Sequence, residues 1–333
     1  MNFIIGPVLL VRFKLGKHLI YLFGDDHTNL ENPKNIYTID YQKIKLGVNA
    51  SKVTIERFIY ELYERAKKQN AHLNLLFEIT PSKEIYTFKD PNNLNNRFDR
   101  LLLLLNVYKF NMENNITINP VDFRVMAEKD GSGSYQSVAL NYFSLFVILF
   151  KNKEYDLIDK IFPINEFEWD IRLLKDTLMD GNFERKEIPA KYEPLFEDVK
   201  DLNGYVQSKY FNELPHEGLK ELIRDLIERK ANSISQDYLT FIKDTTNEKE
   251  RKILEQKIAA VHMWFMDIPA FCVLMEKVTP RPGLTVGYYG AEHVTNILPL
   301  IARLDPYFTT HVAGCEGLDL PTEIREELME FIN

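Results

Sequence analysis

Cysteine is scarce in this chain of 333 residues, which contains only Cys272 and Cys315. Two cysteines are too few for a disulfide framework, and they lack CxxC spacing. This pattern favours a reducing compartment, because disulfide-rich frameworks belong to oxidising ones. Cys272 lies in an apolar helical stretch, where we expect it to act as a small buried hydrophobic residue.

A basic cluster is also missing. The chain has 41 Lys and Arg against 49 Asp and Glu, a formal net charge of −8 and an isoelectric point near 5.5. Proteins that bind nucleic acid need clustered Lys and Arg to neutralise phosphates. The composition therefore argues against a dedicated nucleic-acid-binding protein.

Long apolar runs are absent too. The longest, residues 138–150, is interrupted by Asn141 and Ser144 and is shorter than the roughly 20 residues that a membrane-spanning helix needs. The N-terminal run is broken by Gly6 and Pro7 and has no basic region before it, so it predicts a strand rather than a signal peptide. We expect a cytoplasmic protein with no membrane span.

What the sequence does contain is an alternation of β-rich runs and helical stripes, which predicts an α/β fold with a mostly parallel or mixed central sheet flanked by helices. We expect the core in two halves, residues 1–135 and 247–333, with a helical insert or cap at 136–246. The expected strands are 3–13, 18–24, 72–79, 115–121, 284–289 and 308–313, and the main expected helices of the core are 51–69, 97–111, 294–304 and 323–332.

Two strands end in the same motif. The run that ends at Phe23 continues into Gly24-Asp25-Asp26-His27, and the run that ends at Tyr289 continues into Gly290-Ala291-Glu292-His293. Both are GxxH sequences with a carboxylate beside the histidine. Ligands bind at the carboxyl ends of parallel strands, so we expect the two histidines at one edge of the sheet.

Other ionisable residues also follow predicted strands. Glu78 ends one, and Asp122 and Arg124 follow another. Asp122 and Arg124 either join the site or form a salt bridge with each other. Asp267 lies in an apolar helix just before Pro269, where a kink is expected and where a buried carboxylate can serve a site.

Imidazole and carboxylate groups together suit Zn²⁺, Mn²⁺ or Co²⁺. A bound metal would lower the pKa of its water and make a hydroxide nucleophile. Without a metal, either His27 or His293 can act as general base. In the first case His27, His293, Glu78 and Asp25 are the expected ligands, and Asp25 or Asp26 is a further ligand or the general base.

The paired GxxH motifs with Glu78 between them resemble the TraB/TIKI and erythromycin-esterase/ChaN-like superfamily. The segments Val121-Asp122-Phe123-Arg124 and Met266-Asp267 resemble an uncharacterised branch of large DNA viruses, related to a domain of the Pasteurella toxin. The resemblance covers about residues 17–125 and 255–315. It implies a compact α/β fold and a site formed by His27, Glu78 and His293. The resemblance to the viral branch adds Asp122, Arg124 and Asp267 to this site as residues specific to that branch.

Members of this superfamily differ in function. TIKI-like members are metal-dependent proteases, erythromycin esterases hydrolyse a lactone, and ChaN-like members bind haem. We therefore expect a metal-dependent hydrolase of a peptide or small molecule, located in the host cytoplasm if the gene is viral. The alternatives are a metal-independent esterase or amidase, and a non-catalytic module that binds a ligand or a host protein.

Overall fold

The structure is a computed structural model that describes residues 3–25, 52–79, 115–122, 218–226, 270–278, 281–312 and 317–332, together with 101, 105, 149, 152–154, 156–157, 229, 249 and 266–268. The chain divides into two compact units. Residues 1–121 and 277–333 form unit 1, and residues 122–276 form unit 2. Unit 1 is thus built from both ends of the chain.

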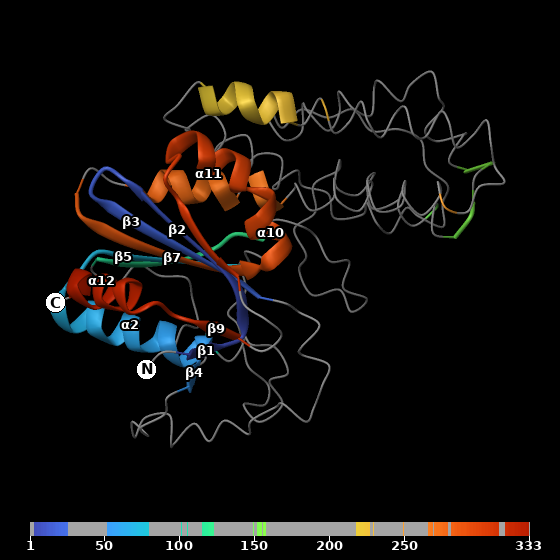
Figure 1. Ribbon diagram of the computed structural model, residues 1–333. Helices are drawn as coiled ribbons and strands as arrows, with labels where there is room; N and C mark the ends of the chain where they lie inside the picture. The colour runs from blue at the N-terminus through green and yellow to red at the C-terminus, as the bar shows by residue number, and fades with distance from the viewer. Residues whose placement is uncertain are drawn as a thin grey trace. The chain divides into compact units, whose positions relative to one another are not determined.

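A six-stranded mixed sheet forms the centre of unit 1 (Figure 1). Its strands, in spatial order, are β6 (Ile116–Pro120), β5 (Leu73–Phe77), β7 (Gly283–Gly290), β3 (His18–Asp25), β2 (Pro7–Leu15) and β8 (Thr309–Val312). The first four are parallel, and the β3–β2 and β2–β8 pairs are antiparallel. The predicted α/β class with a mixed sheet flanked by helices is confirmed.

A second, three-stranded sheet pairs β1 (Phe3–Ile5) with β4 (Lys52–Thr54) and β9 (Gly317–Asp319). The expected single strand over residues 3–13 is therefore wrong. Gly6 has a φ of 120°, a conformation that glycine adopts without steric cost, and this residue separates β1 from β2. The hairpin expected between the next two runs is confirmed as the antiparallel β2–β3 pair.

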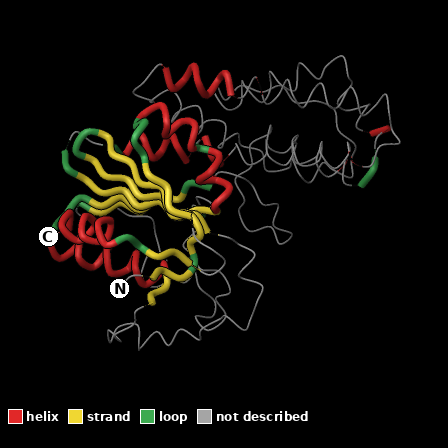
Figure 2. The backbone as a smooth tube through the Cα atoms, viewed as in Figure 1, coloured by secondary structure: helices red, strands yellow, loops and turns green. Residues whose placement is uncertain are grey.

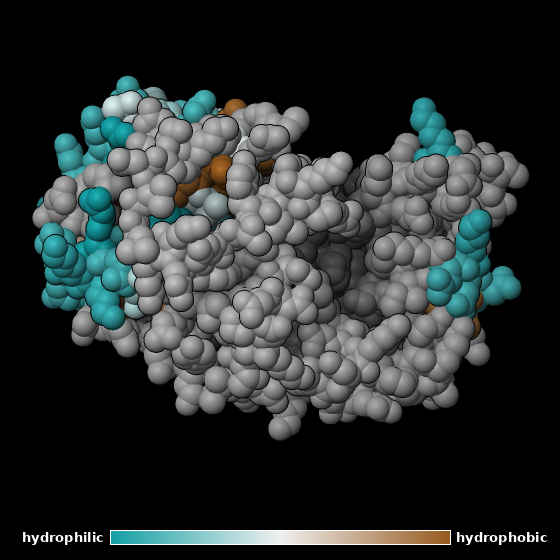
Figure 3. All heavy atoms as spheres, turned by 90° about the horizontal axis from the view of Figure 1, so that it is seen from below, coloured by the Kyte–Doolittle hydropathy of each residue, from teal (hydrophilic) through white to brown (hydrophobic). Residues whose placement is uncertain are grey.

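Helices cover both faces of the large sheet (Figure 2). On one face lie α2 (Ile55–Gln69) and α12 (Thr322–Ile332), whose apolar side chains join those of alternate strand residues in one buried core. On the other face lie α10 (Ala291–Asn296) and α11 (Leu298–Leu304). The outer surface over α2 and α12 is mostly hydrophilic (Figure 3), as the polar sides of amphipathic helices require.

Two predicted helix boundaries are wrong. The helix expected to start at Ser51 begins at Ile55, because Lys52–Thr54 pair with β1; Ser51 itself lies outside the described residues. The single helix expected over residues 294–304 is divided into α10 and α11, which meet at Ile297.

The described residues of unit 2 that have regular structure are all helical, including 218–226 and 270–276. The segment before residue 277 is strongly apolar, and Met266, Phe271 and Leu274 are buried. Most of the predicted insert at 136–246, the kink at Pro269 and much of the predicted helix at 97–111 lie outside the described residues. Within the described ranges, no helix combines the length and apolar character needed to cross a membrane.

Candidate active site

The strands that carry the two GxxH motifs are neighbours in the sheet. β3 and β7 are parallel and in register, so that Gly24 lies opposite Tyr289 and Asp25 opposite Gly290. The strands of the two motifs therefore end at one edge of the sheet, although residues 24 and 290 are far apart in the chain. His27 and Asp26 lie outside the described residues.

Gly24 allows the helix after the second motif to approach β3 closely. A Cβ atom at this position would lie 2.8 Å from the Cα of Ala291, the first residue of α10, and 3.2 Å from the Cβ of Leu9. A side chain would force α10 away from the sheet. The glycine thus fixes the position of the helix that carries His293.

Glu78 joins the two neighbouring strands at this edge. Its backbone N–H donates to the carbonyl of Tyr288, 3.2 Å away, and extends the pairing of β5 with β7. Its carboxylate oxygen Oε2 accepts a hydrogen bond of 2.5 Å from the N–H of Gly290, the N-cap residue of α10. A carboxylate is favoured there because the first N–H groups of a helix have no partner within the helix.

The other carboxylate oxygen of Glu78, Oε1, lies 3.3 Å from Nε2 of His293. The side chains of His293 and Glu78 are only 3% and 9% exposed, so little water screens the interaction between them. The predicted residues Glu78 and His293 are therefore brought together, and Glu78 contacts both the backbone and the imidazole of the second motif.

A second carboxylate lies in the same region. Asp25 is 2% exposed, and its Oδ2 accepts a 2.6 Å hydrogen bond from the hydroxyl of Tyr288. A hydrogen bond to the charged form stabilises a buried carboxylate. Tyr288 was not identified as a site residue from the sequence, although two phenols directly before a GxxH motif were visible in Tyr288-Tyr289.

Tyr289 points to the opposite side of β7 from Tyr288. It is buried, and its ring lies over Gly287, where a Cβ atom would be 2.9 Å from the phenol oxygen. Burial and, to a lesser degree, the negative charge of Glu78 raise the pKa of Tyr289 far above its ordinary value of 10.0. This phenol is neutral at physiological pH.

The remaining predicted site residues are not placed with this group. Arg124 lies outside the described residues, so its predicted salt bridge with Asp122 stays a prediction. Asp122 and Asp267 are both buried but belong to unit 2. Glu292 is exposed on α10. The roles predicted for Asp122, Arg124 and Asp267 are thus untested.

The Glu78–His293 pair fits two corners of a metal site. Two ligands bonded to one tetrahedral metal at about 2.0–2.1 Å lie roughly 3.3 Å from each other, as do Oε1 and Nε2 here. In the part of the chain that the structure describes, no three His, Cys, Asp or Glu side chains are grouped to hold a metal ion. A complete site would need a ligand from outside the described residues, as predicted for His27.

A second buried polar cluster runs across the same sheet near the amino ends of the parallel strands. His18 Nε2 lies 2.7 Å from Thr285 Oγ1, which also accepts from Asn74 Nδ2 at 3.2 Å. Asn74 Oδ1 accepts in turn from the hydroxyl of Thr117 at 2.7 Å. These side chains connect β3, β7, β5 and β6, and they were not identified from the sequence.

Comparison of the chain with protein-family models, with curated proteins and with solved structures finds no match. The resemblance to the TraB/TIKI and erythromycin-esterase/ChaN-like superfamily therefore stays a prediction that rests on the two GxxH motifs and Glu78.

Proposed function

We propose that the protein is a hydrolase whose active site lies at the carboxyl edge of β3, β5 and β7. The observation that carries the proposal is the position of the Glu78 carboxylate. One of its oxygens is held by the Gly290 N–H, and the other faces the imidazole of His293. A buried imidazole beside a fixed carboxylate is an arrangement suited to activating a water molecule.

In the leading form of the proposal, His27, Glu78 and His293 would hold a divalent metal such as Zn²⁺, Mn²⁺ or Co²⁺, with Asp26 as a further ligand or general base. Asp25 is left as a candidate general base, because it is not grouped with Glu78 and His293 as a metal ligand would be. The metal would supply a water of lowered pKa as nucleophile. Tyr288 orients the Asp25 carboxylate through its hydroxyl. The roles predicted for Asp122, Arg124 and Asp267 stay predictions, with Arg124 expected to stabilise a developing oxyanion.

A metal-independent esterase or amidase is the second candidate. It is favoured by the direct approach of His293 Nε2 to Glu78 Oε1, because a carboxylate in contact with an imidazole can orient it and stabilise its protonated form. In this form His293 acts as the general base toward water. The two candidates share their residues and differ in whether activity survives removal of metal.

Hydrolysis by the whole chain tests both candidates. We expect purified protein to cleave a p-nitrophenyl ester or a fluorogenic peptide, and Glu78→Gln and His293→Ala each to lower kcat/KM by about 100-fold or more. Glu64→Gln, on the exposed side of α2, is the matched control and keeps full activity.

Addition of EDTA followed by Zn²⁺, Mn²⁺ or Co²⁺ separates the two forms. Loss and recovery of activity support the metal-dependent enzyme, and activity that survives EDTA supports the second candidate. If both substitutions leave the rate unchanged, or if no substrate is cleaved with or without metal, the hydrolase proposal is wrong.

We further infer that the protein works in a reducing cytoplasm, that of the host if the gene is viral. Cys272 is a free, buried thiol, and burial raises its pKa well above the ordinary value of a cysteine. A thiol in this state is unreactive and serves packing. Immunofluorescence of the tagged chain in expressing cells checks the compartment.

A further inference from the structure

Strand β8 forms one edge of the large sheet. It pairs with β2 alone among the described strands, and the pairing is regular from Thr309 opposite Arg12 to Val312 opposite Leu9. Val312 is 78% exposed, and Tyr307, just before the strand, is 86% exposed. Thr309 and Val312, whose side chains lie on opposite faces of β8, are both exposed, so both faces of the strand are accessible to solvent.

Edge strands of natural proteins usually carry Lys, Pro or a bulge that prevents another strand from pairing with them. The sequence of β8, Thr-Thr-His-Val, contains none of these features. Thr and Val have high β propensity, and His is not among the residues that are depleted in strands. This edge is therefore a template for an additional strand, a recurring mode of peptide recognition.

An acidic groove lies beside this edge, on the side of the sheet covered by α12. It has a volume of about 490 Å³. The strands contribute Arg12, Thr309 and His311 to its lining, and α12 contributes Glu323, Glu326, Glu327 and Glu330. The groove is thus continuous with the accessible side of β8.

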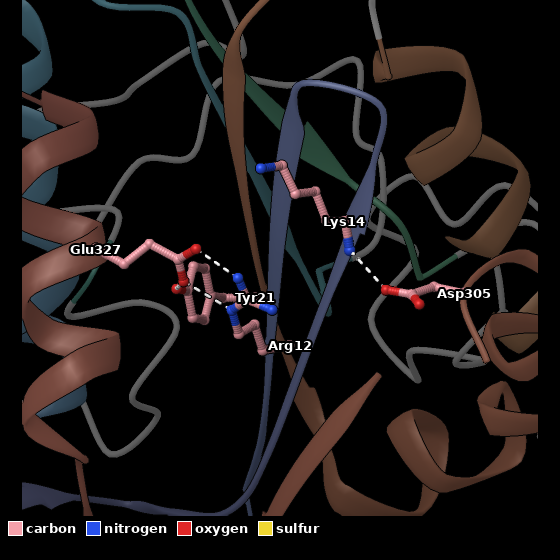
Figure 4. A network of polar contacts seen from close by, with 5 residues as sticks. All are labelled: Arg12, Lys14, Tyr21, Asp305 and Glu327. Carbon is pink, nitrogen blue, oxygen red and sulfur yellow. Dashed lines mark hydrogen bonds and ion pairs between the residues drawn. The ribbon is translucent and has the colours of Figure 1, made fainter. Parts of the chain in front are cut away.

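One of these glutamates is already neutralised. Glu327 forms a two-point ion pair with the Arg12 guanidinium and accepts a hydrogen bond from the Tyr21 hydroxyl (Figure 4). The other three, Glu323, Glu326 and Glu330, form no ion pair with any residue in the described ranges. The groove therefore has a negative surplus directly beside a strand edge.

We propose that β8 binds an extended basic segment of a partner protein, which adds a strand to the sheet and places Lys or Arg side chains in the acidic groove. Backbone hydrogen bonds along β8 supply the affinity, and Glu323, Glu326 and Glu330 supply the charge preference. Glu323 and Glu330 lie about 10 Å apart along the helix, and side chains on one face of a strand repeat about every 7 Å. The two spacings differ by about 3 Å, which the long and flexible side chains of alternating basic residues can span.

A second copy of the chain is a poor occupant of this edge. Pairing of two β8 strands around a twofold axis would bring two acidic α12 surfaces toward each other, in a protein whose net charge is already −8. Like charges placed together across an interface disfavour association. The groove is therefore complementary to a basic partner rather than to itself.

The proposal is tested with the full chain and a fluorescein-labelled heptapeptide that alternates Lys and Val, by fluorescence anisotropy. We expect saturable one-to-one binding that weakens as salt increases, since screening shortens the range of surface charges. A Glu–Val peptide should not bind. The Lys–Val peptide with every backbone amide N-methylated should also fail to bind, because it has the same charge but cannot donate strand hydrogen bonds.

Two protein variants with the same change in net charge complete the test. Glu323→Gln/Glu330→Gln alters the groove and should weaken binding by about fivefold or more. Glu64→Gln/Glu221→Gln alters exposed residues of other helices and should leave binding within twofold. An equal loss of affinity in both variants, or equal binding of the N-methylated peptide, would show charge attraction without strand addition and overturn the proposal. A dimer of the chain whose formation excludes the peptide would also overturn it.

Discussion

His18 is fully buried in the sheet, with one ring nitrogen 2.7 Å from the Thr285 hydroxyl. Burial, and secondarily the nearby His72, lowers the pKa of His18 from 6.5 to about 4. The rings of His18 and His72 meet edge to face, with centroids 6.2 Å apart. In the folded protein at neutral pH, His18 is therefore uncharged, and it gains a proton readily only on unfolding.

This difference predicts acid sensitivity of the fold. Between pH 6.5 and about 4 the unfolded chain binds a proton at residue 18 that the folded chain does not, so the free energy of unfolding should decrease as the pH falls through this window. Urea unfolding measured at several pH values should show this slope. His18→Gln should flatten it, and the control His311→Gln on β8 should retain it; an unchanged slope in His18→Gln would contradict the assignment.

At the scale of one element, α2 shows what the sequence could and could not predict. The apolar stripe that includes Phe58, Ile59 and Leu62 correctly predicted a helix with one buried face. Its start was predicted too early, because the residues before it pair with β1, a contact between distant parts of the chain. The helix instead begins after Thr54, whose hydroxyl accepts from the Arg57 N–H at 3.3 Å.

Thr54→Ala should remove this N-cap and lower the free energy of unfolding by about 1 kcal/mol, since the N–H of Arg57 loses its acceptor. Thr54→Ser keeps the hydroxyl and should cost much less. Urea denaturation monitored by circular dichroism measures both variants. If Ser and Ala destabilise equally, the loss comes from the γ-methyl group or from β4 pairing rather than from the cap.

At the scale of the whole molecule, the order of the strands was the least predictable feature. The sequence indicated the segments that form the six strands of the large sheet, and that Glu78 and the two motifs follow strand ends, but it did not indicate the short strands β4 and β9. It did not indicate that β7, near the end of the chain, lies between β3 and β5. The contacts Asp25–Tyr288 and Glu78–Gly290 depend on this order, and a linear pattern does not show which strands become neighbours.

The central position of β7 predicts that unit 1 cannot fold without the C-terminal part of the chain. A chain that ends at residue 276 would lack β7 and leave β3 and β5 with unpaired edges inside the unit. We expect it to be insoluble or to show no cooperative thermal unfolding by circular dichroism. Co-expression of residues 277–333 should restore soluble material, and a truncated chain that unfolds like the intact one would refute this prediction.

The close approach of α10 to β3 also changes what a GxxH signature means. Gly24 bears no reactive group, and its lack of a Cβ atom leaves room for Ala291. The glycine of the first motif thus acts as a spacer for the helix that carries the second histidine. A search of genomes for such paired sequences would therefore select proteins for this steric requirement of packing as well as for the two histidines.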